Sequence, residues 1–434
     1  MMTDPSLVTL RVDDVAHGGA CVARQSDGRV VFVRHTLPGE HVVARITRTR
    51  SRLAWADAVD ILEASADRVP SVWPEAGPGG VGGGELAHVR PAAQRAWKEQ
   101  VIRTQIRRIG GPLLDEAVRA IGGITVQAAP GDEDPDDTLC GRRTRIELVA
   151  SNEARLGMHV HHGHDLRVLE HMPLAVPALQ DLNVLGAASP IWHGAWGPGE
   201  RVRLVAPNGD DPLIVTPRGF FDRFGDVDDR DALRWDVTLA TGVLQYQVRP
   251  QGFWQTHVEG ASVLARAVVE GAQLRGGEQV MELYAGAGLF SQALAHHALV
   301  SGLKQVAIVT LEGDEAAVAD AAANCRDLPG VDTWVGDVDA QGVKALARQG
   351  ERMPDVVVLD PPRSGAGKDV VRAVAASGAK RVVLVSCDPA AGARDLAGFV
   401  GCGYRLETLW AWDLFPHTHH VESVAVLTRT SRSS

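Results

Sequence analysis

The chain has few aromatic residues, few cysteines and no long apolar run. Aromatics make up 5% of its 434 residues, and its five cysteines are scattered, with no Cys-x-x-Cys pair. An odd, dispersed set of this kind excludes a disulfide framework and a structural zinc site. No apolar run reaches transmembrane length, and the polar opening MMTDPSLVTLRVDD lacks the features of a signal peptide. We therefore expect a cytoplasmic protein that does not enter a membrane.

The length and composition are those of a globular protein with two or three domains. Apolar residues account for 45% of the chain and charged residues for 23%, and the net charge is -10. The basic residues are unevenly spread, with two groups that contain few acids: Arg45, Arg48, Arg50 and Arg52, then Arg90, Arg95, Lys98, Arg103, Arg107 and Arg108. Basic groups on an acidic protein are compatible with RNA binding, but a solvated helix face has the same composition, so charge alone does not decide.

Residues 1–66 are predicted to form an N-terminal barrel. Short segments with alternating apolar positions, such as Val30 and Phe32, are separated by Gly- and Asp-containing turns. This pattern predicts a five-stranded antiparallel barrel of the oligonucleotide-binding type. Such barrels accept single-stranded RNA, although a purely structural β-domain would show the same pattern.

Residues 67–244 are predicted to hold a linker, a helix and a central β-rich α+β domain. The Gly/Pro-rich stretch 70–90 indicates a loop. Residues 91–110 predict an amphipathic helix that starts at Pro91, with this apolar face: Ala96, Val101, Ile102, Ile106 and Ile109. Strand patterns dominate from about 140 to 240. A group of four histidines falls there without the spacing of a helical metal site, so we predict no metal at His159, His161, His162 and His164.

Residues 245–434 alternate between predicted strands and helices. This alternation is typical of a doubly wound parallel sheet, here a Rossmann-like C-terminal domain. The whole chain is therefore predicted to be a multidomain α/β protein. Ligands of such sheets bind where the strands end.

A glycine loop, MELYAGAGLFS, follows the first strand of this domain. Gly286 and Gly288 allow a tight turn and a close approach to a ligand, and the next strand ends at Glu312, where an acid can accept both ribose hydroxyls. A third glycine at the dinucleotide spacing is absent, which disfavours NAD and favours S-adenosylmethionine. The alternative is that Glu312 merely caps the helix that begins near Asp314.

Three reactive side chains follow later strands: Asp360 in LDPPR, Cys387 in VSCDP and Glu422 in HHVES. Methyltransferases that act on exocyclic amines carry an aromatic residue after the two prolines. Arg363 stands there instead, which favours a carbon acceptor. Uracil C5 is a poor nucleophile until a thiolate adds at C6, and a base must then remove the C5 proton. The alternatives are a buried structural cysteine and a surface acid.

The segments YQVRPQGFWQTH, LYAGAGLFS, LDPPRSG, VSCDP and HHVESV resemble the family of RNA uracil-C5 methyltransferases, which act on tRNA and large-subunit ribosomal RNA. The N-terminal barrel resembles the TRAM domain of that family. The resemblance implies that Cys387 attacks C6 and that Glu422 removes the C5 proton. It also implies an RNA partner, no obligate protein partner, and S-adenosylmethionine bound by Gln255, Tyr284, Gly286, Glu312, Asp337 and Asp360.

The chain departs from the family pattern in one large respect. Many members hold an iron–sulfur cluster on four cysteines, and the matching positions here are Trp73, Val81, Gly84 and Met172. Without thiolate ligands we expect no cluster. Leu289 and Arg249 also depart from the pattern, both near the expected cofactor.

Two other functions remain open on the sequence. One is an RNA-binding or RNA-folding protein with a catalytically vestigial methyltransferase domain. The other is a methyltransferase for another nucleobase or for a small molecule. The motifs do not distinguish tRNA from ribosomal RNA.

Overall fold

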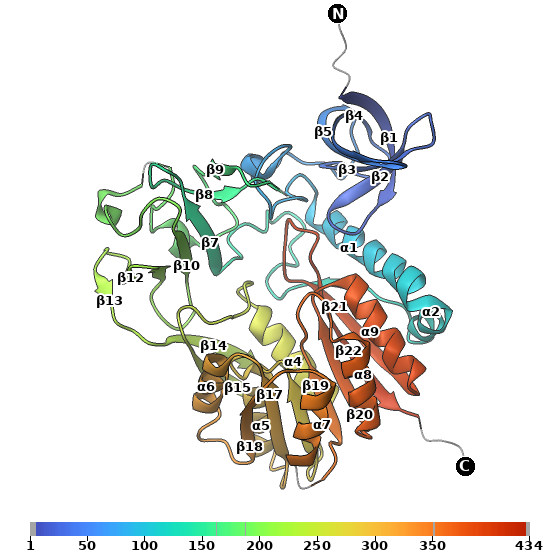
Figure 1. Ribbon diagram of the computed structural model, residues 1–434, viewed down its shortest axis with the longest axis vertical. Coiled ribbons are helices and arrows are strands. Elements are labelled where there is room, and N and C mark those ends of the chain that lie inside the picture. Colours follow the sequence, from blue (N-terminus) through green and yellow to red (C-terminus); the bar gives the residue numbers. More distant parts are fainter. Residues whose placement is uncertain (1–5, 162, 187, 350–351, 431–434) are drawn as a thin grey trace, which may run out of the picture.

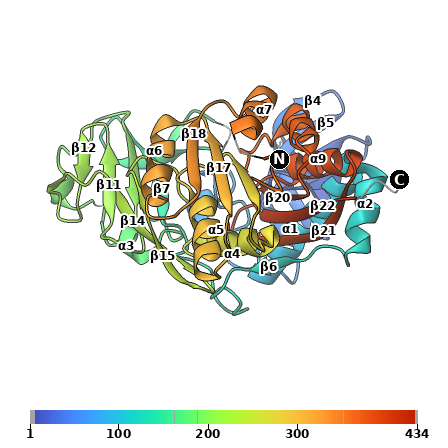
Figure 2. The ribbon, with the colours of Figure 1, turned by 90° about the horizontal axis from the view of Figure 1, so that it is seen from below.

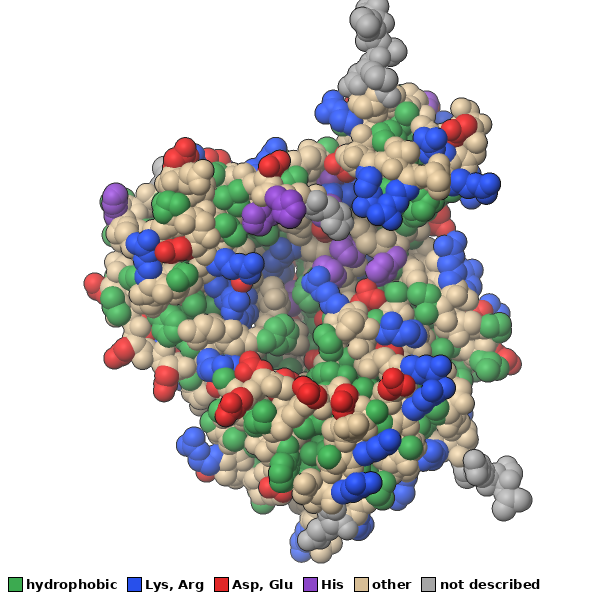
Figure 3. All heavy atoms as spheres, viewed as in Figure 1, with side chains coloured by type: hydrophobic (Ala, Val, Ile, Leu, Met, Phe, Trp, Pro, Cys, Tyr) green, Lys and Arg blue, Asp and Glu red, His purple; other side chains and the backbone are tan. Residues whose placement is uncertain are grey.

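The structure is a computed structural model that describes residues 6–161, 163–186, 188–349 and 352–430. A small barrel, a strand-rich middle part and a large α/β part surround a hollow (Figures 1 and 3). Among the described residues, no helix has the length and apolar character needed to cross a membrane.

The N-terminal part is a closed five-stranded barrel, as predicted. Its strands follow one another around the barrel in the order β1-β2-β3-β5-β4. The prediction that all pairs are antiparallel was wrong, because β3 and β5 run parallel, with Phe32 beside Trp55. Alternate side chains such as Val31 and Val33 fill the interior. The strands are β1 (Leu7–Val15), β2 (Ala20–Arg24), β3 (Val30–Arg34), β4 (His41–Arg50) and β5 (Leu53–Glu63).

The loop after the barrel is organised by apolar side chains. It contains the short 3-10 turn η1 (Pro74–Ala76). Trp73, Val81 and Met172 belong to one buried cluster. A Cβ atom on Gly84 would lie 2.8 Å from the Trp73 ring, so only glycine fits against the indole. Three of the four positions at which the family pattern would place cysteines therefore share one apolar cluster, and the fourth, Gly84, lies against the Trp73 ring.

The predicted helix 91–110 is α1 (Pro91–Gln105), extended by the π-helical turn η2 (Ile106–Gly110). Its apolar face was only partly predicted, since Ala96 and Ile109 are exposed and Lys98 is fully buried in an ion pair with Asp413. The reason is that α1 packs on two sides, against the barrel and against the C-terminal sheet. The next helix, α2 (Gly111–Ala120), also packs on that sheet. The strand β6 (Val126–Ala128) joins the edge of the sheet by parallel pairing with β21.

The strand-rich middle is an antiparallel seven-stranded sheet with the order β13-β12-β11-β10-β7-β8-β9. Its elements are β7 (Arg145–Ala150), β8 (Leu156–His159), β9 (Leu166–Val168), α3 (Pro177–Gln180), the turn η3 (Pro190–Trp192), β10 (Arg201–Val205), β11 (Leu213–Thr216), β12 (Gly219–Phe221) and β13 (Val227–Asp228). A separate hairpin of β14 (Leu233–Leu239) and β15 (Gly242–Val248) leads to the last part.

Of the four histidines considered for a metal, His159 ends β8, and His161 and His164 lie in the following turn. His162 lies outside the described residues. Within the part of the chain that is described, no group of three or more His, Cys, Asp or Glu side chains is placed to hold a metal ion.

The C-terminal part is built on an eight-stranded sheet with the order β18-β17-β16-β19-β20-β22-β21-β6. Strands β16 to β20 are parallel, and β22 runs antiparallel between β20 and β21, so the sheet is not parallel throughout. Its elements are α4 (Gly260–Ala272), β16 (Gln279–Leu283), α5 (Leu289–Val300), β17 (Ala307–Glu312), α6 (Glu315–Asn324), β18 (Val331–Val335), α7 (Ala340–Gln349), β19 (Val356–Leu359), α8 (Gly367–Ala376), β20 (Arg381–Ser386), α9 (Pro389–Gly401), β21 (Tyr404–Asp413) and β22 (Glu422–Arg429).

Both faces of this sheet are covered by helices (Figure 2). Neighbouring strand residues alternate between two cores: Val280 packs with α4 and α5, and Met281 packs with α7, α8 and α9. Burial on both faces explains the continuous apolar runs of these strands. The strand order reverses at β16, which lies between β17 and β19. The carboxyl ends of the strands at such a reversal form a crevice for a ligand.

Candidate active site

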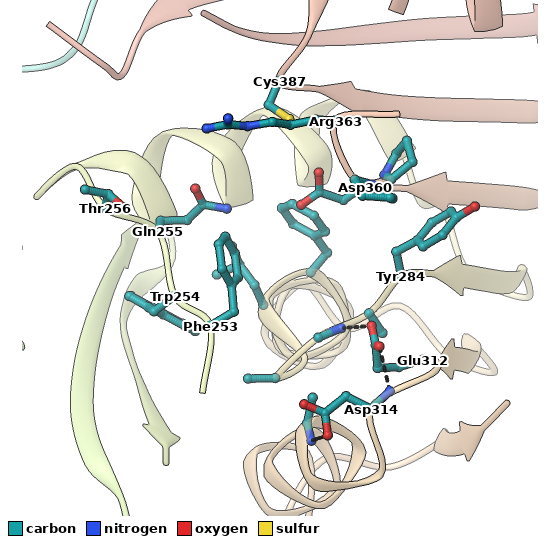
Figure 4. Close-up of a pocket in the computed structure, with 18 of the residues that line it drawn as sticks. Phe253, Trp254, Gln255, Thr256, Tyr284, Glu312, Asp314, Asp360, Arg363 and Cys387 are labelled. Carbon is teal, nitrogen blue, oxygen red and sulfur yellow. Dashed lines mark hydrogen bonds between the residues drawn. The ribbon is translucent and has the colours of Figure 1, made fainter. Parts of the chain in front are cut away.

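A cavity of about 630 Å³ lies at the carboxyl ends of β16, β17, β19 and β20. Seven of the eight predicted site residues line it: Gln255, Tyr284, Gly286, Glu312, Asp360, Cys387 and Glu422. The eighth, Asp337, is exposed on the loop after β18 and is not among the lining residues. Segments at the ends of five strands and from the region before α4 thus converge on one cavity (Figure 4).

The loop from β16 to α5 has an unusual backbone. Gly286 and Gly288 have φ angles of 52° and 84°, and Tyr284 has a φ of 63°. The left-handed region is unfavourable for a bulky residue such as tyrosine, and it is found mainly where a site requires it. A Cβ atom on Gly286 would meet no atom within 4 Å. Glycine there therefore leaves the cavity wall open beside the backbone.

Glu312, at the end of β17, is fixed by two backbone donors. Its carboxylate accepts hydrogen bonds from the N–H groups of Gly286 and Asp314, at 3.0 and 2.9 Å (Figure 4). Asp314 itself caps α6 by accepting hydrogen bonds from the N–H groups at the helix start. The capping alternative for Glu312 is therefore wrong, because the neighbouring aspartate fills that position.

Cys387 and Glu422 meet through the antiparallel pairing of β20 and β22. The ladder pairs Ser386 with Ser423, so Cys387 and Glu422 occupy the next positions of the same register. Cross-strand neighbours of this kind place their side chains close together. Glu422 is buried, and its Oε2 has no hydrogen-bond partner among the described residues.

The charges around the thiol oppose its ionisation. Burial, and then the carboxyl groups of Glu422 and Asp360, raise the pKa of Cys387 to about 12. Burial and Asp360 also raise the pKa of Glu422 well above its ordinary value, and burial raises that of Asp360 to about 7. Arg363, which lies beside Cys387 (Figure 4), acts in the opposite direction on both Cys387 and Glu422.

The wall opposite Asp360 comes from the segment that precedes α4. The Gln255 side chain points from this wall toward Asp360 (Figure 4). Phe253 lines the same cavity and is 72% exposed. Arg249 also lines it and pairs with Asp314 and Asp320, each at 3.1 Å.

Sequence reasoning missed site roles for Arg363, His420 and Phe253, although all three line the cavity. Arg363 lies close in sequence to Asp360, His420 to Glu422 and Phe253 to Gln255. This closeness to the motif residues was the sequence signal that could have identified them.

The cavity suits an elongated cation. Carboxyl groups of Glu312, Asp360 and Glu422 face it together with apolar side chains such as Leu289 and Phe290. Buried carboxylates favour a positively charged ligand, because each lowers the free energy of a nearby opposite charge. S-adenosylmethionine, with a sulfonium, an ammonium and a ribose, matches this set of donors and acceptors.

The barrel reaches the same site. His17, in the turn between β1 and β2, lies 3.0 Å from Asp388, which caps α9 directly after the cysteine. Burial opposes ionisation of Asp388, but the hydrogen bonds from His17 and the helix amides outweigh it, and the pKa falls to about 2. On the same side, buried Glu85 of the loop after the barrel lies 3.7 Å from His419. The barrel and the loop after it therefore contact the C-terminal part at residues close in sequence to Cys387 and Glu422.

Comparison with known proteins gives consistent matches. The TRAM domain model matches residues 6–59, and the tRNA (Uracil-5-)-methyltransferase model matches residues 349–430. A protein named uncharacterized RNA methyltransferase from Streptomyces avermitilis is 38% identical, over 96% of this chain and 97% of that protein. The 23S rRNA (uracil(1939)-C(5))-methyltransferase RlmD of Halomonas elongata is 31% identical, over 96% of this chain and 89% of that protein.

One solved structure shares the fold over the full length. The tRNA (uracil-54, C5)-methyltransferase of Pyrococcus abyssi, in complex with S-adenosyl-L-homocysteine, gives a TM-score of 0.66 at 19% identity. The match covers 97% of this chain and 100% of the archaeal chain. The barrel, the middle sheet and the C-terminal sheet thus form an arrangement already known in a methyltransferase.

Proposed function

Because the chain belongs to the family of RNA uracil-C5 methyltransferases, we propose that it methylates C5 of one uridine in tRNA or large-subunit ribosomal RNA through a covalent bond between Cys387 and C6. The enzyme depends on S-adenosylmethionine. The observation that carries the proposal is the placement of Cys387 and Glu422 at facing positions of the β20–β22 register, at the wall of an acid-lined cavity.

The proposed chemistry uses one thiol and one carboxylate. The Cys387 thiolate adds to C6 of uracil, and the electron pair of the C5–C6 double bond moves to C5. S-adenosylmethionine, when bound, would supply the electrophilic methyl group that C5 acquires, and S-adenosylhomocysteine would be the leaving group. Glu422 then takes the C5 proton, the double bond re-forms, and the C6–S bond breaks to release the thiolate.

The electrostatics of the site explain why ligands would be needed for reaction. Both reacting groups favour their protonated forms in the free protein, since the pKa of Cys387 is about 12 and that of Glu422 is well above its ordinary value. A cationic ligand and Arg363 would each stabilise the ionised forms. We infer that Arg363 is a positioning and electrostatic residue rather than a nucleophile or base, because a guanidinium offers only N–H donors and no acceptor.

We assign cofactor contacts to the cavity residues. The Glu312 carboxylate, oriented by its two backbone donors, is the acceptor for the ribose hydroxyls. Gly286 leaves room for the ligand, and Gln255, Tyr284 and Asp360 line the remaining wall. Asp337 is a more distant candidate on the adenosine side.

The three parts of the chain would divide the work. We propose that residues 245–434 form a Rossmann-like methyltransferase domain, and that residues 1–66 and 67–244 hold RNA around the target uridine. The base must leave its stack to reach a partly buried thiol. We propose that the enzyme acts in the cytoplasm and needs no obligate protein partner.

The test is tritium release from C5-tritiated uridine in total tRNA and total ribosomal RNA. We expect release by the native enzyme from one pool and none by Cys387→Ala. Release by the Cys387→Ala variant would contradict the thiol mechanism. No release from either pool with S-adenosylmethionine binding intact would indicate another acceptor, and loss of both would favour a vestigial RNA-binding protein.

A further inference from the structure

The exposed face of the middle sheet carries an excess of arginine beside the active site. On strands β7 and β10, Glu147 is paired with Arg203, and Arg145 and Arg201 lie on the same face, each two residues along its strand. This face therefore carries three arginines and one glutamate, which pairs with Arg201 and Arg203 only. Figure 3 shows Lys and Arg side chains gathered on the side of the hollow that β7 and β10 form.

Two of these arginines line a groove that shares wall residues with the active-site cavity. The groove has a volume of about 310 Å³ and contains both Arg145 and Arg203. Its wall includes Phe253, Trp254 and Thr256, which also line the larger cavity. A chain that lies in the groove would therefore pass directly beside the entrance to the cavity.

The two arginines retain unused donors. Arg145 donates to the carbonyl of Gly252 at 2.5 Å and pairs with no carboxylate among the residues that the structure describes. Arg203 donates to the carbonyl of Gln251 at 2.7 Å and to Glu147 at 3.0 Å. A guanidinium has five N–H donors, so each can bind a further anion. Burial, and then Arg203, lower the pKa of Arg145 to about 10, which leaves it charged at neutral pH.

We propose that Arg145 and Arg203 bind a backbone phosphate of the RNA segment that carries the target uridine. The inference rests on the proposed function and specifies how its substrate is held. Guanidinium forks match phosphate geometry and bind it through paired N–H donors. The opposite rim of the hollow, over the α/β part, carries acidic side chains (Figure 3). Repulsion from that rim would place the RNA backbone along β7 and β10.

The test is the salt dependence of RNA binding by the full-length enzyme. The probe is a fluorescein-labelled oligouridylate, followed by anisotropy over a range of salt concentrations. Each phosphate contact to a single strand contributes about 0.7 to the slope of log K against log salt concentration. We expect Arg145→Gln and Arg203→Gln each to reduce the slope, and the double variant to reduce it by about 0.7. The matched control is Arg201→Gln, since the Arg201 side chain is 76% exposed, contacts the same Glu147 and lies outside the groove.

Two further measurements separate phosphate binding from support of the 251–252 turn. Arg145→Lys keeps the charge and should keep the slope, and all variants should bind S-adenosylhomocysteine within about twofold of the native enzyme. Unchanged slopes in both glutamine variants, or an equal loss in Arg201→Gln, would overturn the phosphate site.

Tritium release by the native enzyme is measured on the same preparations. Release with unchanged slopes rejects only the phosphate site, whereas reduced slopes without release reject only the uridine chemistry.

Discussion

Glu422 and Cys387 occupy the register position that follows the Ser386–Ser423 pair of β20 and β22. The carboxyl group raises the pKa of the thiol, and both side chains face the same cavity. An antiparallel strand next to β20 thus brings together the proposed nucleophile and the proposed base, which lie far apart in the sequence.

Glu422→Gln should separate bond formation from product release. Without a carboxylate, C5 keeps its proton after methyl transfer, so the C6–S bond cannot break. We expect turnover to fall by about 10²- to 10⁴-fold, the usual contribution of a general base. A covalent protein–RNA complex should accumulate on denaturing gels. Normal turnover by this variant would remove Glu422 from its role.

The affinity for S-adenosylmethionine should increase with pH through Asp360. Burial raises the pKa of this group to about 7, so the carboxyl is mostly neutral at pH 6 and mostly charged at pH 8. A cation binds the charged form better, and we expect about tenfold tighter binding at pH 8, measured by calorimetry. Asp360→Asn should bind more weakly, with a flat profile. A profile that stays steep in Asp360→Asn would assign the dependence to another group.

Glu312 and Asp337 give a matched test of the cofactor contacts. Glu312 lines the cavity and Asp337 does not. Hydrogen bonds to a charged group contribute about 1.5–3 kcal/mol, so Glu312→Gln should weaken S-adenosylhomocysteine binding by about 10- to 100-fold. Asp337→Asn should have a much smaller effect. Equal losses would extend the adenosine site to the loop after β18.

We expect Lys98 to stabilise the fold, although the many basic residues of α1 are typical of a helix face exposed to solvent. Its ammonium group is fully buried and pairs with Asp413. Lys98→Met would leave that carboxylate buried without its partner, and we expect a loss of about 3–5 kcal/mol in the free energy of unfolding. Urea unfolding at pH 7 measures it. Arg95→Met, on the same helix but only partly buried, should change stability by less than about 0.5 kcal/mol.

The sequence was sufficient to predict the α/β alternation and the barrel, because both depend on local periodicity and turn residues. It also placed Asp360, Cys387 and Glu312 together, since parallel strands that follow helices end at one edge of a sheet. The seven cavity residues could be predicted for this reason and from the family motifs.

Features that depend on long-range packing could not be predicted. Helical spacing gave no sign that Lys98 faces Asp413 or that Ile109 is exposed, because two separate partners cover α1. The parallel pairing of β3 with β5 and the contact of His17 with Asp388 depend on how the chain closes on itself. No local pattern encodes either contact.

The central claim is the covalent bond between Cys387 and C6 of uridine. RNA with 5-fluorouridine in place of uridine tests it, because fluorine at C5 cannot be removed as a proton and the complex is trapped. The native enzyme is incubated with this RNA and S-adenosylmethionine, and mass spectrometry is applied to the digested complex. The account predicts a methylated fluorouridine nucleotide attached to the peptide that contains Cys387, and none with Cys387→Ala. Attachment to another residue, or methylation of normal RNA without any trapped complex, would contradict it.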